Sequence, residues 1–123
     1  MANICGYGME VKGEKENVAE FVEYMKDCKE QKLCGVYPDE VFYMYYNNKH
    51  IVNGGCKHSV YISMLEEEGS YYDRLTENDK TKFTTLEQLS KALNLKFEVE
   101  GDTDITGEYE TVIVENGRLM QYE

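Results

Sequence analysis

One cysteine and two histidines in the middle of the chain are residue types suited to metal binding or catalysis. Cys56 and His58 are two positions apart, so an extended strand would point both side chains to the same face. His50 is placed to approach them from the preceding strand. Together these three side chains would ligate a metal ion, and Cys56 with His58 would make a nucleophile and a base.

The metal site and the nucleophile–base pair each lack a residue that their chemistry requires. A fourth metal ligand is not evident, there is no Cys-x-x-Cys pair, and no third residue stands out to orient His58. The glycine-containing stretches fit neither phosphate-binding pattern, GxGxxG or GxxxxGK. We therefore expect a non-enzymatic protein with free thiols, no metal and no cofactor. Metal binding by Cys56, His58 and His50, and a Cys/His enzyme of unknown substrate, stay open as alternatives.

A second candidate group is acidic. Residues 98–115 contain seven carboxylates and no lysine or arginine. On an extended chain, alternate residues would line one face about 7 Å apart, twice the rise per residue. That spacing approximates twice the phosphate spacing along one DNA strand, about 3.4 Å. Such a row fits the cationic groove of a nucleic-acid-binding partner, although a solvated strand face is the ordinary alternative. The row consists of Glu98, Glu100, Asp102 and Asp104, with Glu108 and Glu110 further along.

Tyrosines form the third candidate group. Tyr43 and Tyr45 fall on one face of an expected strand. Exposed tyrosines serve as binding anchors because they offer a large contact area at low entropic cost. Base stacking would need accompanying cations, which are missing here. We therefore assign Tyr43 and Tyr45, with the six acidic residues, to a partner-binding surface. Packing on the sheet face and a homodimer surface are the alternatives.

The net charge of the chain excludes some classes of binding partner. The 123 residues carry 13 Lys+Arg against 24 Asp+Glu, a formal net charge of −11. This balance argues against direct binding to a nucleic-acid backbone or to an anionic membrane surface. The excess lies in residues 62–123, which hold 15 acidic residues against 6 basic ones. No apolar leader or membrane span is evident, so we expect a cytoplasmic protein in the host cell.

The hydrophobic pattern predicts strands and helices in an alternating order. Apolar residues recur at helical spacing from Val18 to Cys28, and again from Leu86 to Leu93. Alternating residues indicate the strands, and Asn116-Gly117 is a strong signal for a hairpin turn. Residues 65–82 are polar and are expected to be irregular, with at most one helical turn. The expected strands are 4–11, 40–46, 56–64, 95–100, 109–115 and 119–122, and the expected helices are 15–29 and 86–93.

This order predicts one α+β domain over residues 1–123. The element sequence β-α-β-β-α-β is that of the split βαβ, ferredoxin-like fold. The last two strands would extend it as a C-terminal β-hairpin.

Two segments resemble the YubB-type ferredoxin-like family, small proteins found on phages, prophages and plasmids. The N-terminal resemblance lies in Met1-x-Asn3-x-Cys5, Met9-x-Val11-x-Gly13 and Val18-x-x-Phe21. The central one lies in Gly55-Cys56-Lys57-His58-Ser59-Val60-Tyr61, where His58 replaces the tryptophan of the family. The resemblance implies a ferredoxin-like fold and a mobile-element origin, and it brings no activity with it.

Together these features predict a small acidic accessory protein of a phage or mobile element. It would bind a host nucleic-acid-handling or defence protein through a basic groove, as an anti-CRISPR-like inhibitor and nucleic-acid mimic. The alternative from another class is sequestration of a small nucleotide signal in the pocket of an oligomer.

Overall fold

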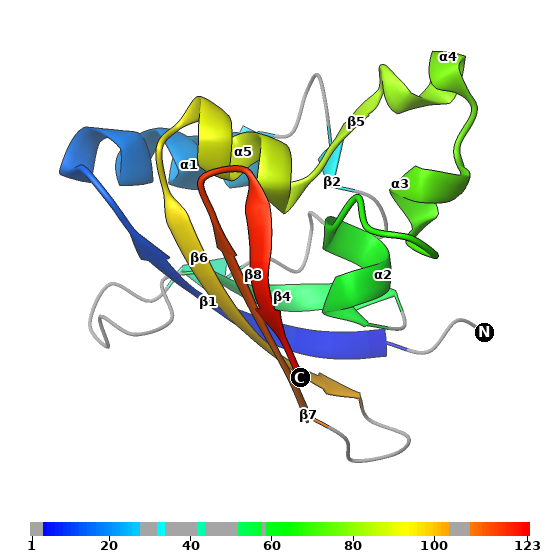
Figure 1. The fold of residues 1–123 in the computed structure, drawn as a ribbon. Coiled ribbons are helices and arrows are strands. Elements are labelled where there is room, and N and C mark those ends of the chain that lie inside the picture. Colours follow the sequence, from blue (N-terminus) through cyan, green and yellow to red (C-terminus); the bar gives the residue numbers. More distant parts are fainter. Residues whose placement is uncertain (1–3, 28–31, 34–41, 44–51, 58, 104–108) are drawn as a thin grey trace.

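The computed structural model describes residues 4–27, 32–33, 42–43, 52–57, 59–103 and 109–123 (Figure 1).

A six-stranded antiparallel sheet forms the centre of the molecule. Its strands lie in the order β3-β4-β1-β6-β7-β8, and every neighbouring pair is antiparallel. A second, two-stranded parallel sheet pairs β2 with β5. The strands are β1 (Ile4–Lys12), β2 (Lys32–Leu33), β3 (Phe42–Tyr43), β4 (Val52–Lys57), β5 (Phe83–Thr84), β6 (Lys96–Thr103), β7 (Tyr109–Glu115) and β8 (Arg118–Tyr122).

Helices α1, α2 and α5 pack on one side of the large sheet, and the short helices α3 and α4 lie further from it (Figure 1). The mixed α/β class is therefore confirmed, with an antiparallel sheet as the main element. The helices are α1 (Lys15–Asp27), α2 (Val60–Met64), α3 (Tyr71–Arg74), α4 (Glu77–Lys80) and α5 (Leu86–Ala92).

The hydrophobic core lies between the sheet and these helices. Alternate residues of β1 and β6, including Met9, Phe97 and Val99, are buried on the helix side. From α1, Phe21 and Met25 pack against them. The helical periodicity expected for residues 15–29 is thus confirmed as far as Asp27, beyond which the next residues lie outside the described part.

The C-terminal hairpin forms at the expected turn. Asn116 and Gly117 have φ angles of 55° and 80°, the left-handed region that a type I′ turn requires at both positions. Asn94, which directly follows the expected helix 86–93, also adopts a positive φ of 53°. The α5 helix begins at Leu86, as expected, and ends one residue earlier, at Ala92. Thr85 caps it, with its Oγ1 accepting a hydrogen bond from the Gln88 N–H at 3.2 Å.

The expected strand over 56–64 is wrong in its second half. Strand β4 ends at Lys57, and Val60–Met64 form helix α2. Val60 and Met64 satisfy the period of a helix as well as that of a strand, and both are buried. Ser59 decides for the helix, because its Oγ accepts a hydrogen bond from the Ile62 N–H at 3.1 Å. The Gly54-Gly55 pair lies inside β4.

The region expected to be irregular contains two short helices. Ser70 caps α3 by accepting a hydrogen bond from the Asp73 N–H, and Thr76 caps α4 through the Asp79 N–H. Each hydroxyl stands immediately before the first helical turn, where it can accept a hydrogen bond from a backbone N–H that has no partner inside the helix. Neither helix has buried residues. In the described part of the chain, α1 is the longest helix with 13 residues, and no helix is long and apolar enough to span a membrane.

The packing at Gly13 yields a test of this fold. A Cβ added at Gly13 would lie 2.6 Å from Leu95 Cδ2 and 3.1 Å from the Asn94 carbonyl oxygen. Gly13→Ala should therefore lower the free energy of unfolding by about 1–3 kcal/mol in urea denaturation. Gly6→Ala is the matched control, because a Cβ at Gly6 meets nothing within 4 Å. Equal midpoints for the two variants would contradict this packing.

Candidate functional site

The residues predicted to bind a partner do not form one continuous surface. Glu98 and Glu100 lie on β6 and face away from the helices, since their neighbours Phe97 and Val99 are buried on the helix side. Asp102 lies in β6 and Tyr43 in β3. The remaining expected residues, Asp104, Glu108 and Tyr45, lie outside the described part of the chain.

Glu98 is already paired within the chain. Its carboxylate lies 3.5 Å from the ammonium nitrogens of both Lys12 and Lys96. Partial burial alone would raise the pKa of Glu98, but the charges of Lys12 and Lys96 outweigh it and lower the pKa below its usual value. The first carboxylate of the expected acidic row is therefore balanced by two cations, and less of its charge is available to a partner.

Glu100 stands beside a group of glycines. Gly6, Gly8 and Gly55, which we call the glycine patch, share one face of β1 and β4 by strand alternation and by the register Gly6↔Gly55. In the register of β1 and β6, Gly8 lies opposite Glu100. Gly6 is exposed and the space above it is open, whereas Gly8 and Gly55 are buried. Glycines inside strands weaken them and often mark a close approach of a ligand or another chain.

Tyr109 lies on the same face as Glu100. It begins β7 directly opposite position 102 of β6, and 77% of its surface is exposed. Glu100 and Tyr109 therefore supply a carboxylate and an exposed aromatic ring near the glycine patch. Tyr109 was not among the residues expected from the sequence, although the alternation of Val112 and Val114 places it on the outer face.

Glu110 points to the other side of the sheet. It shares the parity of the buried Val112 and Val114, and its Oε1 accepts a hydrogen bond from the Tyr61 N–H at 3.0 Å. Burial raises the pKa of Glu110, while this backbone hydrogen bond opposes the rise. The carboxyl therefore acts at the N-terminus of α2 and is separated from Glu98 and Glu100 by the sheet.

Cys56 is a core residue. Its side chain is fully buried on the helix side of β4, and its thiol is free of any disulfide. His50 and His58 lie outside the described part of the chain. Among the described residues, no group of three or more His, Cys, Asp and Glu side chains is placed to hold a metal ion. The burial of Cys56 in the core therefore does not support the alternative of a Cys/His enzyme.

A buried carboxyl on α5, that of Glu87, is not among the candidate residues that the sequence patterns indicate. Glu87 is 3% exposed, and both of its oxygens accept the Glu66 N–H, at 3.1 and 3.2 Å. Thr85 Oγ1 donates to Glu66 Oε1 at 2.8 Å. Burial, followed by the hydrogen bond with Glu67, raises the pKa of Glu87 to about 8. Glu87 therefore carries a proton at neutral pH and joins the end of α2 to the start of α5.

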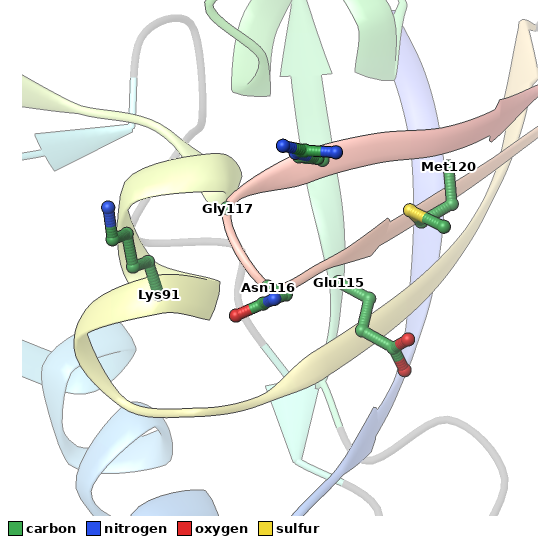
Figure 2. Close-up of a pocket in the computed structure, with 6 residues that line it drawn as sticks. Lys91, Glu115, Asn116, Gly117 and Met120 are labelled. Carbon is green, nitrogen blue, oxygen red and sulfur yellow. The ribbon is translucent and has the colours of Figure 1, made fainter.

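Two open cavities lie at the end of the sheet where the C-terminal hairpin turns. Figure 2 shows Lys91 rising from α5 beside the turn at Asn116 and Gly117, with Glu115 and Met120 extending from the hairpin strands. Arg118 also lines this cavity, which has a volume of about 440 Å³. The neighbouring cavity, of about 510 Å³, shares Glu115 and Asn116 and adds Lys12 and Lys96. Four cations thus surround one end of an acidic protein.

Comparisons with known proteins give no relative from which a role could be transferred. No family model, curated protein or solved structure matches the chain. The resemblance to the YubB-type family therefore stays a prediction, and the function has to be argued from the residues themselves.

The raised pKa of Glu87 predicts a pH-dependent stability. The folded state holds a proton up to about pH 8, whereas the unfolded chain releases it near the ordinary pKa of 4.5. Stability should therefore fall as the pH rises from 4.5 to 8. Glu87→Gln keeps one acceptor for the Glu66 N–H and replaces the bound proton with an amide. It should remove this slope and stabilise the protein at pH 7 by no more than about 3 kcal/mol.

The measurement is urea unfolding of both proteins at several pH values between 5 and 8. Glu68→Gln, an exposed residue of the same segment, is the control for the loss of one negative charge. A wild-type slope that persists in Glu87→Gln would show that Glu87 does not hold the proton.

Proposed function

We propose that this chain is a small, non-enzymatic binding protein of a phage or other mobile element. It inhibits a host nucleic-acid-handling or defence protein by occupying a basic groove of that protein, as an anti-CRISPR protein does. The net charge of −11 and the resemblance to the YubB-type family support this assignment. Electrostatic attraction to a basic groove would speed the encounter and select the partner.

The observation that carries the proposal is the exposed Gly6 of the glycine patch, on the same face of the sheet as Glu100 and Tyr109. A glycine inside a strand costs roughly 0.5–1 kcal/mol relative to alanine, so two glycines on the central strand β1 call for a compensating role. The open space above Gly6 admits a lysine or arginine side chain of a partner. Its charge would then lie beside the Glu100 carboxylate, and Tyr109 would cover its apolar stem.

The binding surface in this proposal is smaller than the sequence suggested. Glu98 contributes less because Lys12 and Lys96 balance its charge. Glu110 is excluded because it faces α2. The surface therefore centres on Glu100, Tyr109 and Gly6. Positions 102, 104 and 108 belong to the same acidic stretch of the sequence.

We also propose that strands β3, β4, β1 and β6 with helices α1 and α5 form a ferredoxin-like unit. Their order in the sheet supports this, because a split β-α-β-β-α-β chain places its last strand beside the first and its third between the first and second. Helices α2, α3 and α4 are insertions before α5, and β7 with β8 is the C-terminal extension.

The test begins with a partner captured from host lysate by the wild-type chain and then purified. Binding of the pure partner should weaken at higher salt and should displace nucleic acid from it. Glu100→Lys should weaken the binding about tenfold or more, because a partner cation would meet a like charge. Gly6→Tyr should do the same by filling the open space.

Glu115→Lys is the matched control, since it reverses an exposed charge on the same face at the far end of β7. The affinity of the Glu115→Lys variant for the partner should stay within about threefold of that of the wild type. Circular dichroism would establish that all three variants are folded. The proposal is wrong if Glu100→Lys binds as tightly as the wild type, or if nucleic acid and this chain bind the partner together.

The cavities at the hairpin turn favour a second candidate function, the sequestration of a small nucleotide. Lys91 and Arg118 border the first cavity, and the structure records no ion pair for either among the described residues. Cations without an internal partner are available for a phosphate group.

A panel of nucleotides at millimolar concentration should then raise the melting temperature of the chain. Lys91→Glu should abolish the rise, and Lys82→Glu on the separate α4–β5 segment should preserve it. A melting temperature that no nucleotide changes would rule this candidate out.

A further inference from the structure

The last strand of the large sheet is an edge that carries exposed apolar side chains. β8 pairs with β7 on one side and is the last strand in the order β3-β4-β1-β6-β7-β8. The large hydrophobic residues exposed among the described residues are Tyr109, Met120 and Tyr122, and two of these three lie on β8. An exposed apolar edge is a template for pairing with another strand.

This edge has little of the protection that monomeric proteins place on such strands. Proline, charged side chains (lysine above all), a β-bulge and a covering helix are the usual devices. The segment 118–123 contains neither proline nor lysine, and its single cation is Arg118. The irregularity between Ile113 and Val114 lies on the paired side, where Met120 is the extra residue of β8.

That irregularity decides which side chains share a face. Leu119 lies opposite the buried Val114 and Tyr122 opposite the buried Val112, so both lie on the helix side. Arg118 lies opposite the exposed Glu115, and Glu123 exchanges backbone hydrogen bonds with Thr111, so both lie on the outer side. Because Met120 is an extra residue between them, the side chains of Arg118 and Glu123 point to the same side of the sheet, although the two residues are five positions apart.

We propose that β8 pairs antiparallel with β8 of a second copy of this chain, so that the two large sheets become one. The register places Arg118 opposite Glu123 of the second copy. It also places Leu119 opposite the second copy's Tyr122 on the helix side. The two-fold symmetry repeats each pair, which is the self-complementarity that an isologous interface requires.

The charges on β8 favour a second copy of this chain as the partner and an antiparallel direction of the two strands. A cation at one end of β8 and an anion at the other attract each other only when the two strands run antiparallel; a parallel pair would place like charges together. The Tyr122 ring is already held on the helix side, because it packs against Tyr61 of α2 with ring centroids 4.7 Å apart and the ring planes tilted by 39°. Leu119 packs partly against the core. This inference does not depend on the proposed function.

The test is the oligomeric state of the full chain by analytical ultracentrifugation, in about 0.3 M salt to screen the repulsion between two acidic copies. The wild type should form a dimer at micromolar concentration. Arg118→Glu alone and Glu123→Arg alone each place like charges at both ends of the interface. Each should raise the dissociation constant about tenfold or more.

The double variant Arg118→Glu with Glu123→Arg restores opposite charges in swapped positions, and its dissociation constant should return to within about threefold of the wild type. This rescue separates pairing through β8 from a general effect on folding. A wild type that stays monomeric up to about 100 µM overturns the proposal. So does a dimer that neither single variant weakens, because its interface would then lie elsewhere.

Discussion

Phe21 of α1 packs against Phe97 of β6 with ring centroids 4.8 Å apart, and the orientation of the sheet depends on this contact. Both rings are fully buried, and Phe97 lies on the strand that joins β1 to β7. A slip of one residue in β6 would turn Phe97 and Val99 to solvent and bury Glu98 and Glu100. The contact therefore determines which carboxylates face outward, and with them the surface that a partner can reach.

The acidic residues of this chain have different structural roles, so the net charge does not describe a single surface. Glu98 is paired with two lysines, Glu110 caps α2, and Glu87 is buried and protonated at neutral pH. The segment from Glu66 to Asp79 adds six acidic residues on and around the short helices, away from the sheet face. Much of the negative charge thus serves folding or lies outside the region that first suggested a nucleic-acid mimic.

The sequence allowed α1, the C-terminal hairpin and the two faces of β6 to be predicted, because each depends on local periodicity or on a turn type. Helix α2 could not be predicted in this way. Val60, Ile62 and Met64 fit a strand, and one of the contacts that stabilise the helix comes from Glu110, which is 49 residues away. Glu87 was missed for the same reason, since its burial depends on the return of the chain to Glu66. Glu110 was predictable in part, because it shares the parity of Val112 and Val114.

The two proposed surfaces occupy different parts of the sheet and are compatible in one assembly. β6 and β7 separate β1, which carries Gly6, from β8. A second copy that pairs with β8 would therefore leave Gly6 and Glu100 accessible. Antiparallel pairing of two edge strands keeps the helix sides together, so both glycine patches would lie on the same face of the joined sheet. A partner with two basic grooves, or one long groove, would then bind both copies, and its affinity would exceed that for a single copy without any new contact.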